Sequence, residues 1–164
     1  MPRVSDSAIV VRPATISDGE AILRLERELA EFERLEGPSA QEGERLLRWI
    51  FEEKLLHALV AERDGSVAAS ALYFFFPTSF RARLGLYLED LVVSAGARSS
   101  GAGHALMAEL ARIAERLGCI RMEWAVLDWN DRALAFYRRL GARPHREWLR
   151  YVLDAPDIHA LARD

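Results

Sequence analysis

Residues Arg98 to Gly103 form the stretch whose residue types most clearly suggest chemistry: an arginine, two serines and two glycines around an alanine. An apolar run precedes it and a segment with helical spacing follows. Backbone N–H groups and the positive end of a helix dipole would therefore meet at one spot, which suits an anion such as phosphate. A flexible turn with a surface arginine explains these residues equally well. Nucleotide triphosphate and dinucleotide loops are unsupported, because no Gly-Lys-Ser/Thr follows and Leu106 replaces the third glycine of G-x-G-x-x-G.

Two adjacent carboxylates, Glu89 and Asp90, interrupt the apolar run 86–94 (LYLEDLVVS). This run predicts a central strand, since leucine and valine occupy most of its positions. Ionised side chains in such a strand need a partner, a solvent-filled cavity or a function. An ion pair with one of the chain's arginines is the plain structural alternative.

The composition indicates an ordinary soluble protein. The chain has 164 residues, of which 51% are apolar and 29% charged, and its net charge is −3. A nucleic-acid partner is disfavoured, because such proteins more often carry a basic excess. Cys119 is the single cysteine, so a reducing compartment is expected. No apolar run approaches the roughly 20 residues of a membrane span, and no signal peptide is recognisable. We expect a cytoplasmic protein without a membrane partner.

The pattern of apolar residues predicts a mixed α/β chain. Helices are expected from about residue 18 to the break at 37–39, around 46–51, over 101–117, from the cap at Asn130 to Gly141, and in a short tail from about 157. An Asp64-Gly65 pair between two apolar runs predicts a hairpin. Strands are expected at 9–14, 55–63, 67–76, 86–94, 119–127 and 147–153.

Four segments together resemble the Gcn5-related N-acetyltransferase (GNAT) superfamily. Residues 98–103 match its R/Q-x-x-G-x-G/A loop, and residues 130–142 match its N-x-x-A-x-x-F-Y-x-x-x-G-A block. The stretches VRPAT, LAEFE, YLEDLVV and LDWN are similar to the narrower diamine branch, which acts on spermidine and spermine or on thialysine. Ser99 and Ala97 depart from the frequent residues of the loop.

The resemblance implies an α/β fold of one domain, with a mixed, mostly antiparallel central sheet flanked by helices. The N-acetyltransferase domain would span 9–153, with terminal extensions at 1–8 and 154–164. It also implies acetyl-CoA as co-substrate, held at its pyrophosphate by the loop and at its pantetheine arm by the 91–93 strand edge. The implied cofactor-binding residues are Leu91, Val92, Val93, Arg98, Ser99, Ser100, Gly101, Ala102, Gly103, His104, Asn130, Ala133 and Phe136.

Two residues are candidate catalytic groups. Through the resemblance, Tyr137 is a general acid for the CoA thiolate, since a phenol with the ordinary pKa of about 10 can protonate a departing thiolate without large tuning. From its position alone it would be a core tyrosine. Glu89 is a candidate base for the amine, directly or through water, or else only binds the cation. The implied substrate-binding residues are Phe32, Glu33, Glu89, Asp90, Glu123, Trp124 and Trp148. For Glu33, a solvated helix face is an equally good explanation.

The predicted function is acetyl-CoA-dependent N-acetylation of a primary amine by direct attack in a ternary complex. The substrate would be a small cationic amine, a polyamine or diamine or a thialysine-like amino acid. The alternatives are another amine acceptor (an aminoglycoside or a protein N-terminus) and a non-catalytic acyl-CoA-binding module that regulates a partner. The four histidines show no metal spacing, so no metal is expected. The relatives are homodimers, and we expect a homodimer.

Overall fold

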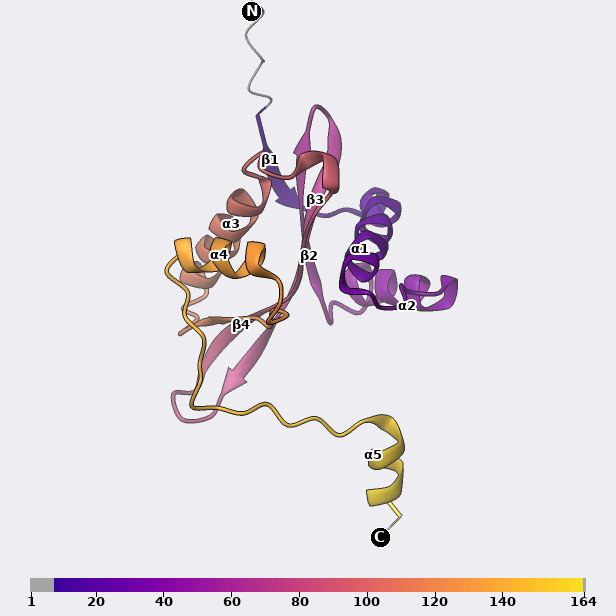
Figure 1. The fold of residues 1–164 in the computed structure, drawn as a ribbon, viewed down its shortest axis with the longest axis vertical. Helices are drawn as coiled ribbons and strands as arrows, with labels where there is room; N and C mark the ends of the chain where they lie inside the picture. The colour runs from indigo at the N-terminus through magenta and orange to yellow at the C-terminus, as the bar shows by residue number, and fades with distance from the viewer. Residues whose placement is uncertain (1–7, 164) are drawn as a thin grey trace, which may run out of the picture. The chain divides into compact units, whose positions relative to one another are not determined.

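The computed structural model describes residues 8–163, and the chain divides into two units, Met1–Ala125 and Val126–Asp164. The first holds the sheet and three of the α-helices, and the second holds the other two that lie within the described residues (Figure 1).

The sheet of the first unit has five strands within residues 8–163, in the order β1-β2-β3-β4-β5. The first four strands are antiparallel neighbours, and β5 joins β4 in parallel. The fold class is therefore confirmed as α/β with a mixed, mostly antiparallel sheet. The strands are β1 (Val10–Pro13), β2 (His57–Arg63), β3 (Ser66–Thr78), β4 (Arg83–Val93) and β5 (Met122–Glu123).

The predicted hairpin joins β2 to β3. Asp64 and Gly65 both have left-handed backbone, with φ of 53° and 74°. Two central residues with positive φ match the twist of antiparallel strands, which is why Asp-Gly favours this connection. The turn confirms the hairpin prediction.

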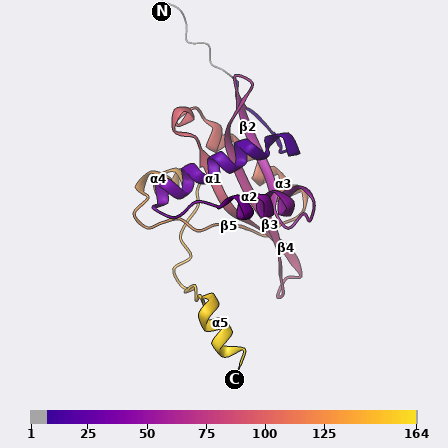
Figure 2. The same cartoon turned by 90° about the vertical axis from the view of Figure 1, so that its right-hand side faces the viewer.

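Three helices cover the two faces of the sheet. Helices α1 (Gly19–Glu33) and α2 (Ala40–Phe51) lie on one side of the strands and α3 (Ala102–Arg116) on the other (Figures 1 and 2). Burial is the main reason for this layering, since each fully buried leucine or isoleucine contributes about 1.5–3 kcal/mol. On the α1/α2 face the core cluster consists of Ile22, Ile50, Ala58, Val60 and Leu72.

An ion-pair cluster fixes the start of α1 against the sheet edge. Arg12 of β1 donates from Nη1 and Nη2 to the two carboxylate oxygens of Asp18, at 2.7 and 2.9 Å. Its Nε donates to Glu62 of β2 at 3.0 Å, and the backbone N–H of Thr15 donates to Asp18 at 2.7 Å. The Arg12 hydrogen bonds lower the pKa of Asp18 to about 2. This carboxylate is therefore committed to the fold.

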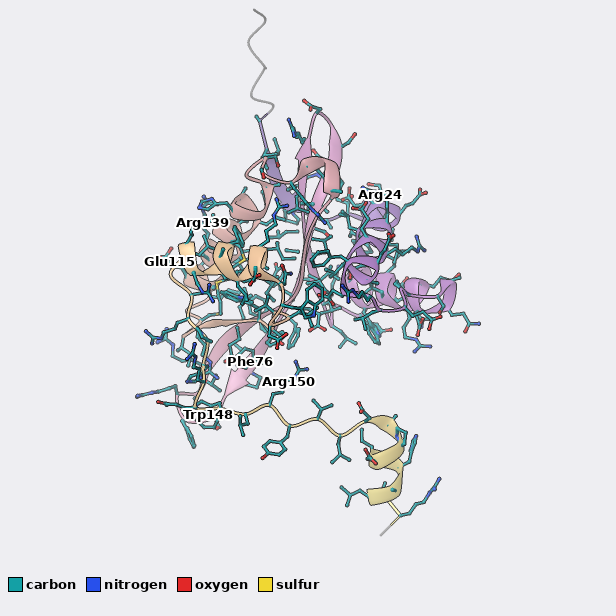
Figure 3. All side chains as sticks on the ribbon, in the orientation of Figure 1. Arg24, Phe76, Glu115, Arg139, Trp148 and Arg150 are labelled. Atoms are coloured by element: carbon teal, nitrogen blue, oxygen red, sulfur yellow. The ribbon has the colours of Figure 1, made fainter. Side chains whose placement is uncertain are left out.

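The second unit contains α4 (Asp131–Arg139) and α5 (Ala155–Leu161). Asn130 caps α4 as predicted, because its side-chain oxygen accepts from the N–H of Ala133 at 3.1 Å. The prediction of a strand at 147–153 is wrong. Glu147 lies in a turn and residues 148–153 pair with no strand, and the side chains of Trp148 and Arg150 project from the run between α4 and α5 (Figure 3).

The strand predicted at 119–127 is also shorter than expected, because only Met122–Glu123 pairs with a neighbour. Apolar alternation favours an extended backbone, but a strand also needs hydrogen bonds from an adjacent strand. Of the helices in residues 8–163, none is both long and apolar enough to cross a membrane.

Candidate active site

The glycine-rich loop connects the end of β4 to the start of α3. After Val93 the chain makes a 3₁₀ turn at Ala95–Ala97, in which the N–H of Ala97 donates to Ser94 O at 2.9 Å. Ser99 and Gly101 then take left-handed backbone, with φ of 67° and 89°. These two positions turn the chain sharply into the helix, so the loop has a defined shape.

The first turn of α3 offers backbone donors to an anion. An α-helix leaves its first N–H groups without intrahelical acceptors, and here one of them, from Ala102, donates to Ser100 Oγ at 3.3 Å. A Cβ placed on Gly101 would meet nothing within 4 Å, so the backbone at this point faces open space. Donors, helix dipole and open space together fit the pyrophosphate of acetyl-CoA.

Arg98 of the loop contacts the end of α1. Its guanidinium carbon lies 5.7 Å from the centroid of the Phe32 ring, which is a cation–π contact. The structure thus brings a predicted cofactor residue and a predicted substrate residue together. This adjacency follows from the fold and was not part of the sequence prediction.

Strands β4 and β5 pair over a very short distance. In the described part of the chain, β5 pairs with β4 at Leu86 and Tyr87 alone. Further along β4, residues 91–93 keep their ladder with β3, opposite Ala71, Ser70 and Ala69. Their β5-side edge is the predicted pantetheine position, because a strand edge can hydrogen-bond an extended ligand.

A β-bulge lies between the two halves of β4. Leu72 of β3 pairs with Asp90 and Tyr73 pairs with Leu88, so Glu89 is the extra residue on β4. Such a bulge bends the strand and redirects a side chain. Glu89 is exposed here, whereas Asp90 is half-buried. The bulge therefore explains how adjacent carboxylates occupy different environments.

Four side chains form a carboxyl cluster: Glu26 and Glu33 of α1 with Glu89 and Asp90 of β4. Burial raises the pKa of Glu26 to about 8, helped by Asp90, Glu89 and Glu33. Burial also raises the pKa of Asp90 to about 6, helped by Glu89 and Glu33. The charges that act on this pair are carboxylates, so the cluster is complementary to an ammonium group.

Sequence reasoning missed Glu26. A signal was present, since Glu26 follows Ile22 by four residues and so shares the apolar face of α1. A carboxyl group at such a position points toward the sheet and needs a special environment. In the structure, the neighbour of this carboxyl group is Asp90.

The other two substrate-binding candidates of the first unit, Glu123 and Trp124, do not belong to the carboxyl cluster. Glu123 of β5 forms an ion pair with Arg121, and its side chain is 41% exposed. Trp124 follows it and is half-buried. An occupied carboxylate is a weaker candidate for substrate binding than Glu89 or Asp90, so the role of Glu123 stays a prediction.

The remaining candidates belong to the second unit. Tyr137 is half-buried on α4, with its ring 5.3 Å from that of Phe136. Trp148 is 72% exposed and lies 6.1 Å from the His145 ring. The proton-donor role of Tyr137 and the substrate role of Trp148 stay predictions. Within residues 8–163, the structure contains no group of three or more His, Cys, Asp or Glu side chains placed to hold a metal ion.

The comparisons with known proteins agree with this geometry. The model of the acetyltransferase (GNAT) family matches residues 20–142. The chain is 35% identical over 164 residues to the thialysine N-epsilon-acetyltransferase of Mus musculus, covering 93% of this chain and 96% of the mouse protein. It is 39% identical over 102 residues to the L-ornithine N5-acetyltransferase of Arabidopsis thaliana, covering 61% of this chain and 45% of that protein.

A solved structure shows the same fold. An integron cassette protein from V. cholerae has a TM-score of 0.78 and 24% sequence identity, covering 95% of this chain and 98% of the other. The chain therefore belongs to the GNAT acetyltransferase family. It is an N-acetyltransferase that uses acetyl-CoA as co-substrate and acetylates a small amine. The predicted family, enzyme class and co-substrate are confirmed.

Proposed function

We propose that this acetyltransferase acts on the terminal primary amine of a thialysine-like amino acid or of a short polyamine. The observation that carries the proposal is the carboxyl cluster, whose two perturbed members are surrounded by negative charge. A diamine chain, or the amino-bearing end of a basic amino acid, supplies the missing cation. The names of the mouse and Arabidopsis relatives support an acceptor with an amine on a short alkyl chain.

The proposed roles of the first unit follow from its geometry. Acetyl-CoA supplies a thioester carbonyl as the acyl donor. The N–H groups at the start of α3, with Arg98, would hold its pyrophosphate, and the edge at Leu91–Val93 would hold its pantetheine arm. That edge would also direct a backbone N–H at the thioester oxygen, where negative charge develops.

Three proton movements complete the proposed reaction. The substrate ammonium loses a proton to Glu89 through water, and the free amine attacks the carbonyl carbon. The carbon–sulfur bond breaks, Tyr137 gives a proton to the departing sulfur, and the new amide nitrogen loses its second proton to solvent, from which Tyr137 is reprotonated. A water relay is needed for Glu89, because carboxylates as a class are much weaker bases than amines. Binding of the cation without proton transfer is the alternative role of Glu89.

Two substitutions separate these roles. Tyr137→Phe is expected to lower kcat about ten-fold or more with acetyl-CoA affinity unchanged, a typical loss for a general acid. Unchanged turnover would remove Tyr137 from the mechanism. Glu89→Gln is expected to remove the acidic limb of the pH–rate profile; a rise in KM without that change would assign Glu89 to binding.

We also propose that the protein is a cytoplasmic homodimer. The family resemblance supports the dimer, as do the exposed apolar side chains of Trp148, Leu149 and Tyr151 in the second unit. The single cysteine, Cys119, supports a reducing compartment. Light scattering at working concentration would give twice the mass of one chain, and a single-chain mass would contradict the dimer.

An amine panel tests the substrate class. Purified protein is incubated with acetyl-CoA and, separately, thialysine, lysine, ornithine, putrescine, spermidine, spermine, an aminoglycoside and a peptide N-terminus. Products are identified by mass spectrometry. We expect acetylation of the thialysine-like amino acids or the polyamines. Acetylation of the aminoglycoside or the peptide alone would overturn the proposal.

A further inference from the structure

Glu26 and Asp90 meet across the interface between α1 and the sheet. Asp90 pairs with Leu72 of β3, and Leu72 belongs to the same core cluster as Ile22 of α1. Glu26 lies one helical turn after Ile22, so it projects toward the same region of the sheet. The two carboxyl groups therefore lie close enough for each to shift the pKa of the other.

This contact requires a proton between the two groups. Two ionised carboxylates have no donor, so a hydrogen bond between them exists only when one is protonated. Burial is the largest cause that raises the pKa of both, and it affects Glu26 more, to about 8 against about 6 for Asp90. Glu26, the more strongly shifted of the two, is therefore the expected proton donor at neutral pH, and Asp90 is its expected charged partner.

Within residues 8–163, the surroundings of Glu26 provide no cation to pair with its charge. Its Oε1 atom is buried without a hydrogen-bond partner. The charged groups that act on it are Asp90 and Glu89 from β4 and Glu33 from its own helix, and all are carboxylates. A buried carboxyl group in such a place costs stability, which a leucine would not.

We propose that Glu26 is a positioning residue, which orients the Asp90 carboxylate and sets the charge of the amine site through one shared proton. The inference rests on the proposed function, because it assigns that site a third carboxyl group. With the proton in place, Asp90 is held in one orientation. When Glu26 ionises, the cluster gains one negative charge and binds a cation more tightly, but Asp90 loses its donor.

Three variants separate the charge of Glu26, its hydrogen bond to Asp90 and the general effect of removing a charge from the helix. Glu26→Gln keeps a donor for Asp90 but does not ionise. Glu26→Leu removes both properties. Glu31→Gln, on the exposed surface of the same helix, removes one charge away from the cluster and is the matched control.

The first measurement uses a permanently charged probe, so that the amine's own titration does not interfere. A bis-quaternary ammonium alkane is tested as a competitive inhibitor against the amine between about pH 6.5 and 9.5, around the ordinary titration range of such a perturbed carboxyl. We expect the Ki of wild type to fall several-fold through the ionisation of Glu26. Glu31→Gln should follow wild type, and Glu26→Gln should show no such fall.

The second measurement reports orientation. At pH 7, Glu26→Leu is expected to lower kcat/KM about ten-fold while Glu26→Gln stays within about three-fold, the pattern of a lost hydrogen bond rather than of a lost charge. An identical pH dependence of Ki in Glu26→Gln and wild type would overturn the inference. So would unchanged kcat/KM in Glu26→Leu. If Glu26→Leu does not fold, the comparison of Glu26→Gln with wild type decides.

A stability measurement keeps this inference distinct from the proposed function. If wild type acetylates no amine, the proposed function fails while Glu26 remains testable. Its pKa is raised from 4.5 to about 8, so the folded chain holds a proton that the unfolded chain has lost. The stability of wild type relative to Glu26→Gln should therefore fall as pH rises across that window. A constant difference would overturn the inference.

Discussion

Asp18 and Asp90 are both aspartates beside helix α1, but their neighbours have opposite charge. Asp18 accepts two hydrogen bonds from Arg12 and one from the backbone of Thr15, and its pKa is lowered to about 2. Asp90 lies beside Glu26, and its burial together with the charges of Glu89 and Glu33 raises its pKa to about 6.

The difference separates a carboxylate that supports the fold from one available to a ligand. Asp18 is fully supplied with donors, so ionising it stabilises the folded chain. Asp90 is surrounded by groups of its own sign, so ionising it costs stability that a bound cation would restore. Perturbed titratable groups of the second kind gather at functional sites. We therefore interpret the Arg12 cluster as structural and propose the carboxyl cluster as the substrate-binding site.

The largest expected effect comes from removing the cation beside Asp18. Arg12→Met keeps the apolar stem and deletes the guanidinium, which leaves a carboxylate with 7% of its side chain exposed. We expect a loss of about 3 kcal/mol in the free energy of unfolding, measured by urea denaturation. Arg24→Met is the control, because Arg24 pairs with Glu28 on the exposed side of α1 and should cost less than about 1 kcal/mol. Equal losses in both variants would end the distinction.

The pH dependence of stability should also distinguish Asp18 from Asp90, with a smaller change in the free energy of unfolding. The pKa of Asp18 is lowered from 3.8, so its contribution is present above that value and is lost as pH falls toward about 2. We expect wild type to lose about 2 kcal/mol across this window, and Asp18→Asn to lack that component. The pKa of Asp90 is shifted in the opposite direction, upward from 3.8 to about 6. Wild type should therefore lose stability relative to Asp90→Asn as pH rises across that window. Urea denaturation at stepped pH measures both slopes, and slopes of the same sign would contradict the comparison.

A second arginine extends the contrast to the co-substrate. Arg98 lies on an exposed loop and contacts the Phe32 ring, whereas Arg12 contacts a buried carboxylate. Arg98→Gln is expected to weaken acetyl-CoA binding by about 1 kcal/mol, or five-fold, since the arginine supplies one charged contact to a phosphate. The free energy of unfolding should change by less than about 0.5 kcal/mol. Calorimetric titration measures the affinity, with Arg112→Gln on the outer surface of α3 as control; unchanged affinity in Arg98→Gln would remove it from the cofactor site.

Local patterns predicted most of the fold. Asp64-Gly65, the cap at Asn130 and the apolar period of α3 each depend on neighbouring residues, and each is confirmed. The strand expected at 147–153 is wrong because EWLRYVL alternates correctly but has no pairing in the structure. Strand pairing depends on distant residues, which alternation does not reveal.

Only part of the site was predicted, because it too combines local patterns with contacts between distant residues. The loop and the Glu89-Asp90 pair stand out in sequence because their types conflict with an apolar surrounding. Glu26 differs from the other glutamates of its helix only by sharing the apolar face with Ile22, and this signal is weak until the helix is placed on the sheet. The bulge at Glu89 also depends on the register between β3 and β4, which no local pattern specifies.

We propose that the carboxyl cluster binds the amine substrate at the expense of stability. The decisive variant is Asp90→Asn, with acetylation of the best amine and the free energy of unfolding measured on the same preparation at pH 8. We expect a kcat/KM at least about ten-fold lower, as for loss of a charged contact, with stability equal to or above that of wild type. Unchanged kcat/KM together with reduced stability would show that Asp90 serves the fold and does not bind the substrate.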